Sequence, residues 1–312
     1  MSLPSLRQLE YLVALADASH FRKAAERVHV SQPTLSGQIK ELEQRLGVSL
    51  VERTRHFVHL TPVGKAVADR ARGVLREVED LRELARTCGA NLGGTIRLGV
   101  PQTLGPYLLP YAVPTLRAEY PGLKLYVGED RPRALERSLK EGIFNLLMTT
   151  LPVHDPNAEK MALFHEPVLV GIARDHPLSR RSSIGSKDLK GQTVLSLGPG
   201  HRLYEQVQLL CEAFGATLIS DYEGTSLDAL RQMVGMGMGL SFFPALYVRS
   251  EMDNDDQVVT LPLAIDTPRR TIGLAWRGQS PRAADYRRFG GIINSVARAC
   301  FADALCWSDM ED

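Results

Sequence analysis

Side chains able to exchange hydrogen bonds with another molecule gather in one short segment near the start of the chain. After Val30 the sequence reads SQPTLSGQIKELEQRL, and its apolar residues recur at helical spacing as Leu35, Ile39, Leu42 and Leu46. The other side of this helix carries hydroxyl, amide and ammonium groups. Such groups match the base edges of a DNA major groove, while the amides at the helix start face phosphates.

A shorter helix is predicted just before this segment. Its apolar stripe consists of Phe21, Ala24, Ala25 and Val28. Ser31 is suited to cap the second helix, and Pro33 lies in its first turn, where a missing N–H costs nothing. Two helices with a tight turn between them form a helix-turn-helix. The alternative is an ordinary helical hairpin whose outer face meets only solvent.

Residues 51–60, VERTRHFVHL, alternate apolar residues with basic ones and are predicted to form a two-stranded wing. Its basic residues and histidines are Arg53, Arg55, His56 and His59. Positive charge beside a recognition helix commonly follows the sugar-phosphate backbone of DNA. In isolation, a small edge hairpin with arginines for solubility is an equal alternative.

The run AAERVHVSQPTLSGQIKELEQRLGVSLVERTRHFVHLTPVGKAV resembles the N-terminal winged helix of LysR-type transcriptional regulators, and the resemblance extends from about residue 5 to the end of the chain. It implies a sequence-specific DNA-binding regulator without enzymatic activity. Double-stranded DNA is the implied partner, and RNA polymerase is a further candidate. The DNA contacts that the resemblance implies are Ser31, Gln32, Pro33, Thr34, Ser36 and Lys40 in the recognition helix and Arg53 in the wing.

The composition is that of an ordinary globular protein with room for two or three domains, at 312 residues, 44% apolar and 23% charged. A net charge of +1 would not by itself reveal a DNA-binding protein. The sequence has no export signal and no stretch of eighteen apolar residues, so we expect a cytoplasmic protein without membrane contact. The cysteines, at 88, 211, 300 and 306, lack metal-ligand spacing, so neither metal nor cofactor is expected.

A long helix is predicted after the wing, with Thr61 as its cap and Pro62 at its first position. Small or apolar residues then recur at alternating steps of four and three, at Val67, Ala71, Val74, Val78, Leu81, Ala85 and Cys88. This spacing is typical of a coiled-coil seam and predicts dimerisation through the helix, with Val67, Val74, Val78 and Leu81 as seam residues. The alternative is a helix packed against its own domain. The resemblance implies a homodimer or homotetramer.

Short β-rich runs alternate with helical patterns after the break at Asn91–Gly94. Strands are predicted at 95–100, 123–127, 145–150, 168–173, 193–197, 240–243 and 272–276, and helices at 106–120, 132–141, 203–214, 226–237 and 283–300. This alternation predicts parallel sheets with helices on both faces, in one domain or two half-size ones. The resemblance decides for two lobes around a cleft.

The predicted fold is therefore α/β, with an N-terminal winged helix-turn-helix, a long linker helix and a two-lobed, periplasmic-binding-protein-like effector domain. The predicted bounds are residues 1–60 for DNA binding, 61–90 for the linker and dimerisation helix, and 91–312 for the effector domain. A solute-binding protein is an alternative for the last part alone. The winged helix and the lack of an export signal argue against it.

Three turns at predicted strand ends place hydroxyls and amides at helix starts, a setting that suits an anionic small molecule. The candidate effector-binding residues in these turns are Pro101, Gln102, Thr103, His201, Arg202, Thr225 and Ser226. An anion held by Arg202 and His201, facing Thr103 and Ser226, is the sharper hypothesis. The plainer one is that the hydroxyls only cap helices and that Arg202 pairs with Glu205.

Within the family, the C-terminal half is most similar to the peroxide-sensing OxyR branch, through PQTLGPYLLP, TSLDALRQMVGMGMGLSFFPAL and PRRTIGLAWRGQSP. Members of that branch use a reactive cysteine in a Gly-His-Cys sequence and a second cysteine nine residues later. This chain has Gly200-His201-Arg202, with Cys211 nine residues after Arg202. An arginine cannot form a disulfide, so we expect a small effector to control the regulator. The alternative is a thiol-based oxidative-stress sensor in which Cys211 is redox-active.

Overall fold

The computed structural model describes residues 3–53, 58–87, 92–224, 226–253, 255–264 and 270–307. The chain divides into two compact units. One comprises residues 1–89 together with 140–143, and the other comprises 90–139 and 144–312. Each unit has its own hydrophobic core.

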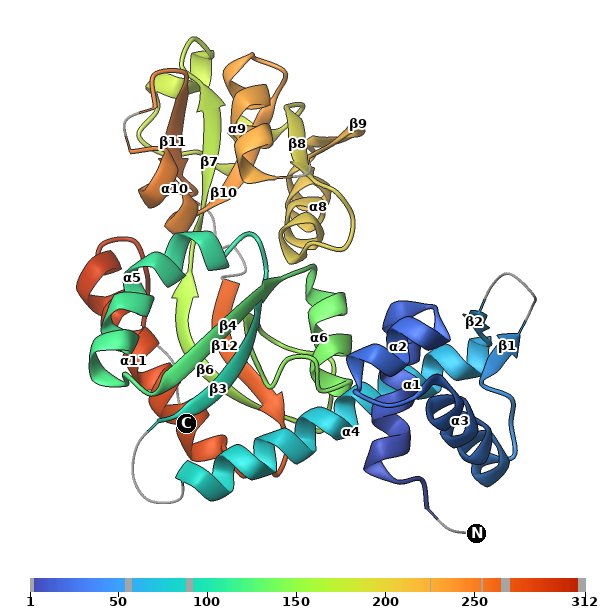
Figure 1. The fold of residues 1–312 in the computed structure, drawn as a ribbon. Coiled ribbons are helices and arrows are strands. Elements are labelled where there is room, and N and C mark those ends of the chain that lie inside the picture. Colours follow the sequence, from blue (N-terminus) through green and yellow to red (C-terminus); the bar gives the residue numbers. More distant parts are fainter. Residues whose placement is uncertain are drawn as a thin grey trace. The chain divides into compact units, whose positions relative to one another are not determined.

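The N-terminal unit is a winged helix-turn-helix followed by a long helix (Figure 1). Its helices are α1 (Leu6–Ala18), α2 (Phe21–Arg27), α3 (Gln32–Leu46) and α4 (Pro62–Thr87), and its wing strands are β1 (Val51–Arg53) and β2 (Val58–Leu60). The two strands pair antiparallel. Most of the apolar residues predicted for α2 and α3 lie in the core of this unit, where Ala24, Leu35 and Ile39 are fully buried, but Leu46, the last residue of α3, is 37% exposed and lies outside it.

The predicted helix starts are confirmed at two hydroxyl residues. The Oγ of Ser31 accepts a hydrogen bond from the backbone N–H of Thr34 at 3.3 Å, and the Oγ1 of Thr61 accepts one from Gly64 at 2.9 Å. Gly64 is required for a steric reason, because a Cβ atom there would lie 2.0 Å from the carbonyl oxygen of Leu50. The first turn of α4 therefore lies directly against the chain segment that leads into the wing.

The predicted seam of α4 has two different surroundings. Val67 packs against the core of the winged helix, and Ala71 is only 2% exposed. Farther along, Val74 and Leu81 are 40% and 59% exposed, and Val78 is half-buried. The start of the seam is thus used within its own subunit, as the alternative hypothesis expected. Exposed apolar side chains at Val74 and Leu81 fit a contact with a second copy.

We expect the paired substitution of Val74 and Leu81 by aspartate to yield a smaller species in sedimentation velocity. A dimer seam would then hold four carboxylates without partners, whereas a single subunit loses no packing because both side chains are exposed. Lys65→Asp, at an exposed polar position of α4, is the control and should keep the native size. An unchanged sedimentation coefficient for the paired variant would show that α4 does not hold the subunits together.

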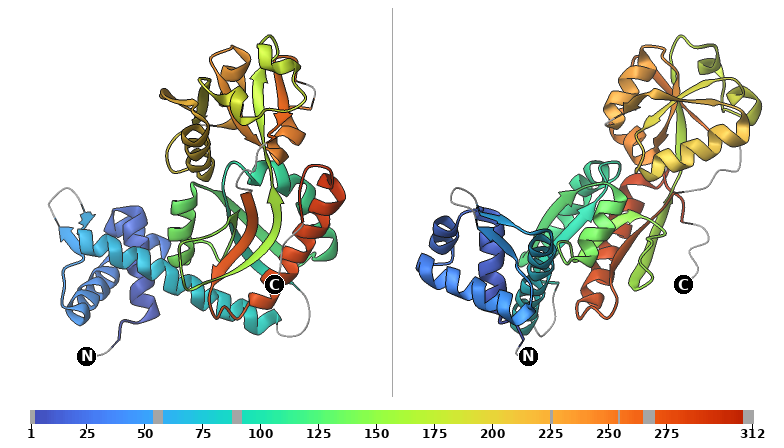
Figure 2. Two further views of the ribbon diagram at one scale, coloured as in Figure 1. Left: turned by 180° about the vertical axis from the view of Figure 1, so that it is seen from behind. Right: turned by 90° about the vertical axis from the view of Figure 1, so that its right-hand side faces the viewer.

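The C-terminal unit consists of two lobes, each built on a five-stranded sheet with helices packed against it (Figure 2). Lobe I has the strand order β4 (Leu123–Glu129), β3 (Gly94–Val100), β5 (Leu146–Thr150), β12 (Arg270–Arg277) and β6 (Ala158–Glu166). Its helices are α5 (Gly105–Glu119), α6 (Pro132–Lys140) and α11 (Ala283–Phe301). The apolar sides of these helices and strands form its core.

Lobe II has the strand order β11 (Val258–Pro262), β7 (Val168–Ala173), β10 (Leu240–Pro244), β8 (Thr193–Leu197) and β9 (Thr217–Gly224). Its helices are α7 (Ser186–Leu189), α8 (Arg202–Phe214), α9 (Leu227–Gly235) and α10 (Ala245–Glu251), with a short 3-10 helix, η1 (Pro177–Arg180). The predicted two-lobed architecture is therefore confirmed.

The prediction of parallel sheets is wrong for the strands that join the lobes. β3 and β8 pair with their neighbours in parallel, but β12 is antiparallel to β5 and β6, and β7 is antiparallel to β10 and β11. The reason is the route of the chain. β6 passes through Pro167 directly into β7 of the other lobe, and β12 brings the chain back into lobe I, so β7 and β12 each enter their sheet from the other lobe and not through a strand–helix–strand unit within one sheet, as a parallel pair requires.

The last described residues fold back onto β6. The backbone N–H of His165 donates to the carbonyl of Cys306 at 2.8 Å, and the N–H of Cys306 donates to the carbonyl of His165 at 2.9 Å. Trp307 donates its indole N–H to Asn294 of α11 at 3.0 Å, and the guanidinium of Arg298 lies over the Trp307 ring. The chain after α11 is thus held against the outer side of lobe I.

Candidate functional site

The recognition helix α3 presents the polar surface that the sequence predicts. Leu35, Ile39 and Leu42 are fully buried and fix which side of α3 faces outward. The predicted DNA contacts that are exposed are Ser31, Gln32, Pro33, Thr34 and Lys40, whereas Ser36 is half-buried. Arg53 ends β1, but its side chain lies outside the described part of the chain. The helix therefore offers hydroxyl, amide and ammonium groups along its first three turns.

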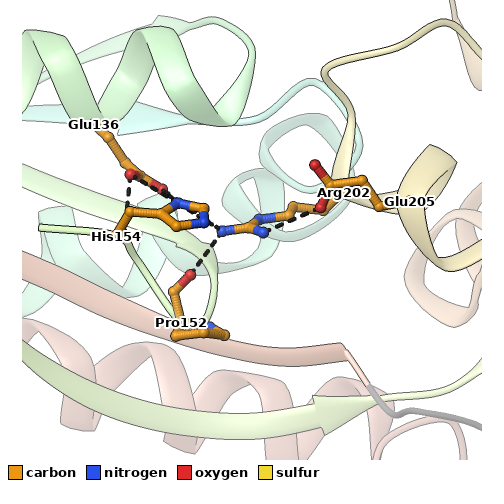
Figure 3. A network of polar contacts seen from close by, with 5 residues as sticks. All are labelled: Glu136, Pro152, His154, Arg202 and Glu205. Carbon is orange, nitrogen blue, oxygen red and sulfur yellow. Dashed lines mark hydrogen bonds and ion pairs between the residues drawn. The ribbon is translucent and has the colours of Figure 1, made fainter.

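Arg202 joins the two lobes of the C-terminal unit (Figure 3). It is the first residue of α8 in lobe II, and one terminal nitrogen of its guanidinium donates to the carbonyl of Pro152 at 2.8 Å. The same nitrogen lies 3.2 Å from Nδ1 of His154. Pro152 and His154 follow β5 of lobe I. The other terminal nitrogen donates to Glu205, one turn further along α8, at 3.1 Å.

Glu136 of α6 completes this group on the lobe I side. Its carboxylate accepts the backbone N–H of His154 at 3.1 Å and lies 3.3 Å from Nδ1 of the same residue. It is also 3.8 Å from the Arg202 guanidinium. The side chains of Arg202 and Glu136 are only 19% and 15% exposed, so solvent screens their attraction less than it screens a surface pair. We call these contacts of Arg202 with Pro152, His154 and Glu136 the Arg202 bridge.

A second inter-lobe connection is fully buried. Glu166 ends β6 and Arg270 begins β12, and their charged groups lie 3.2 Å apart at 0% and 1% exposure. Burial raises the pKa of the Glu166 carboxyl, and the charge of Arg270 opposes that shift. The carboxylate accepts the backbone N–H of Leu246 of α10 at 3.0 Å, whereas Arg270 donates to Thr103 at 3.2 Å. This ion pair therefore connects lobe II with lobe I.

His201 lies buried immediately before α8, 7% exposed, and its side chain does not cap the helix. Burial lowers its pKa, and the charge of Arg131 lowers it further, so the imidazole is neutral at neutral pH. The neighbouring Gly200 has a φ of 95°, a left-handed conformation that favours glycine, and a Cβ there would lie 3.5 Å from the Arg131 side chain. Arg131 of lobe I thus approaches the start of α8.

The structure distributes the predicted effector residues among different contacts. Thr103 is buried and bonded to Arg270, whereas Arg202 takes the Glu205 pair that the plainer hypothesis expected. Ser226 caps α9 by accepting from the N–H of Ala229 at 3.2 Å. Of the remaining predicted residues, Pro101 is buried, Gln102 is exposed, and Thr225 lies outside the described residues.

Cys211 lies on α8 as a buried thiol. Burial raises its pKa to about 11, and the charge of Glu212 adds to the shift. Only a small fraction is thiolate at neutral pH, and the thiolate is the reactive form. Cys300 is exposed, Cys306 is half-buried, and both are free thiols, whereas Cys88 lies outside the described residues.

None of the helices in the described residues has the length and apolar character needed to span a membrane. Nor do the His, Cys, Asp and Glu side chains of these residues include a group of three placed to hold a metal ion.

Comparison with known proteins identifies the family. Residues 6–65 match the bacterial regulatory helix-turn-helix protein, lysR family, and residues 89–298 match the LysR substrate binding domain. The chain belongs to the LysR family of DNA-binding transcriptional regulators, a family of regulators and not of enzymes.

Similar relatives include regulators named for hydrogen peroxide. The chain is 42% identical over 291 residues to the DNA-binding transcriptional dual regulator OxyR of Escherichia coli K12, which covers 93% of this chain and 95% of that one. It is 38% identical over 296 residues to the hydrogen peroxide-inducible genes activator of Haemophilus influenzae, covering 95% of this chain and 98% of the relative.

Solved structures agree with this placement. A full-length OxyR variant from Pseudomonas aeruginosa superposes with a TM-score of 0.74 at 35% identity, covering 96% of this chain and 99% of that one. An OxyR mutant from Corynebacterium glutamicum gives a TM-score of 0.66 at 30% identity, covering 97% and 94%. The chain is thus OxyR-like in sequence and in fold.

Ser36→Arg should abolish specific operator binding while leaving the fold intact. The long cation would occupy the space where α3 approaches bases, and each lost base contact costs on the order of 1–3 kcal/mol. Gln44→Arg adds the same charge eight residues farther along α3, about 12 Å away, and should leave specific binding in place. Equal operator affinities for both variants in fluorescence anisotropy would show that the Ser36 side of α3 does not contact DNA.

Arg270→Met should destabilise the C-terminal unit by about 3–5 kcal/mol in urea unfolding, because it leaves the Glu166 carboxylate buried without its cation. Combining it with Glu166→Gln removes the stranded charge and should recover part of that loss. Arg181→Met, which breaks the exposed pair with Asp188, is the control and should cost roughly 0–1 kcal/mol. A similar decrease in the free energy of unfolding for Arg181→Met and Arg270→Met would show that the buried pair contributes no more to stability than the exposed pair does.

Proposed function

We propose that this chain is an OxyR-like transcriptional regulator in which the Arg202 bridge, and not a peroxide-reactive thiol at that position, sets the state of the regulatory domain. The observation that carries the proposal is the placement of Arg202. Its guanidinium belongs to lobe II and donates to Pro152 and approaches His154 of lobe I. A residue in that place influences how the two lobes are held together.

DNA binding in this proposal uses the outward side of α3 and the wing. The exposed hydroxyls, amide and ammonium group at the start of α3 would read bases and phosphates in one half-site. A second subunit, paired through the exposed apolar residues of α4, would supply the other half-site. The relative arrangement of the lobes would then change the spacing of the DNA-binding units and, with it, operator affinity.

The chemistry of residue 202 supports a switch without a thiol at this place. The resemblance to the OxyR branch aligns Gly200-His201-Arg202 with a Gly-His-Cys sequence. A guanidinium has no sulfur to oxidise. The cysteine that follows nine residues later, Cys211, is buried with a raised pKa and reacts slowly as a nucleophile at neutral pH.

A second candidate function is a thiol-based sensor of the OxyR type. The names of the relatives favour this alternative over a small-molecule effector, since several are called hydrogen peroxide-inducible genes activators. A sensor of this kind would have to use the cysteines that the chain retains, with Cys211 at the position expected of a second cysteine. The exposed Cys300 would be the more accessible thiol.

The small anionic effector predicted from the sequence would compete with carboxylates of the protein for the guanidinium of Arg202. Two carboxylates already lie beside its guanidinium, Glu205 at 3.1 Å and Glu136 at 3.8 Å. A carboxylate ligand would have to replace one of them. Replacing Glu136 would break the bridge, whereas replacing Glu205 would leave it in place.

Peroxide titration of operator binding tests the proposal. We expect wild type to bind its own upstream DNA equally with and without peroxide in a mobility-shift assay. Arg202→Cys restores a Gly-His-Cys sequence nine residues before Cys211 and should gain a peroxide response that a dithiol reductant reverses. Arg202→Lys keeps the charge without a thiol and serves as the control.

Two outcomes would contradict the proposal. Reversible switching of wild type by peroxide, lost in Cys211→Ser, would establish the thiol-sensor alternative. Operator affinity and peroxide response in Arg202→Ala identical to wild type would show that the bridge does not set the regulatory state. Cys300→Ser in the wild-type background separates a specific response of Cys211 from oxidation of an exposed thiol.

A further inference from the structure

One ring nitrogen of His154 faces two partners that require opposite protonation states. Its Nδ1 lies 3.2 Å from the terminal nitrogen of Arg202 and 3.3 to 3.4 Å from the two carboxylate oxygens of Glu136. Arginine only donates hydrogen bonds, so Arg202 needs a lone pair on Nδ1. An ionised carboxylate only accepts them, so Glu136 needs a proton there. A single nitrogen satisfies one partner or the other (Figure 3).

The neutral form of His154 with its proton on Nε2 strengthens the bridge between the lobes. Nδ1 then accepts from Arg202, which also donates to Pro152, while Glu136 keeps its hydrogen bond from the backbone N–H of His154. Two acceptors of lobe I thus hold one guanidinium of lobe II. Glu136 adds its negative charge 3.8 Å away.

The protonated form weakens the bridge in two ways. Nδ1 now donates to Glu136, so Arg202 loses an acceptor and faces an imidazolium instead. The imidazolium also forms an ion pair with Glu136, which weakens the attraction between Glu136 and the Arg202 guanidinium. Arg202 keeps its contacts with the Pro152 carbonyl and with Glu205 of its own helix.

The surroundings of His154 allow this exchange. The charged groups in contact with it are Glu136 of α6 and Arg202 of α8, and Glu205 lies on the far side of the guanidinium. The His154 side chain is 61% exposed, so protons reach it directly from solvent. Histidine is the side chain whose charge ordinarily changes between pH 5 and 8.

We propose that protonation of His154 removes one of the two hydrogen bonds that Arg202 donates to lobe I, so that the strength of the link between the lobes depends on pH. The inference rests on the proposed function only for its effect on DNA. The change in the bridge itself is a property of the regulatory domain, with or without an operator. Acidification below neutral pH should loosen the link and change operator affinity.

The test compares full-length wild type with His154→Asn, whose amide can hydrogen-bond but does not titrate. Amide hydrogen exchange in residues 151–155 and 200–205, without DNA, is measured at pH 8.0 and 5.5 and compared between the two proteins at each pH. We expect wild type to lose about tenfold more protection than His154→Asn at the lower pH, the size expected for losing a hydrogen bond to a charged group. His176→Asn, a capping histidine of lobe II, should behave as wild type.

Operator affinity is measured over the same pH range by fluorescence anisotropy. Wild type and His176→Asn should show a step that His154→Asn and Arg202→Ala lack. Identical exchange in wild type and His154→Asn at both pH values would overturn the inference. A protein that binds no operator at any pH would contradict the proposed function instead, and the exchange comparison would still decide whether His154 controls the bridge.

Discussion

The buried pair of Glu166 and Arg270 is the constraint on which the regulatory domain depends. Both residues lie where strands cross from one lobe to the other, and neither charge reaches water. A buried charge without its partner is costly, so the two crossing strands must stay in register with each other. Glu166 also accepts a hydrogen bond from Leu246 of lobe II, and Arg270 donates one to Thr103 of lobe I. These bonds tie the paired ends of the two strands to both lobes. The contacts of Arg202 with Pro152 and His154 are made in that same arrangement of the lobes.

An ionic bridge has different regulatory properties from a disulfide. A covalent switch needs an oxidant to set it and a reductant to reset it. In our proposal the Arg202 bridge exchanges hydrogen bonds and charge with groups already beside it, so competition from a proton or an anion would be sufficient to change it. Its partial burial limits the screening of the attraction by solvent, and its partial exposure leaves it open to that competition. On this proposal the OxyR-like fold would carry a switch of either chemical kind.

Local sequence signals predicted much of this structure. Ser31 and Thr61 marked helix starts because capping is local, and the apolar runs marked β7 and β8. The missed strand β6 begins with the half-exposed residues Ala158 and Glu159, which lack an apolar run. Local reasoning also anticipated the pair of Arg202 and Glu205 one turn apart. It could not place Pro152 or His154 beside Arg202, because about fifty residues and a lobe crossing separate them.

The return of the chain end to His165 has a consequence for association between molecules. β6 is the edge strand of its sheet, and an edge strand offers unpaired backbone groups to any other extended chain. At His165, next to the crossing into lobe II, Cys306 already occupies both backbone groups. The backbone of β6 at this position is therefore not available to a strand of another molecule, which shortens the part of the sheet edge that is open to strand addition, a common route to aggregation.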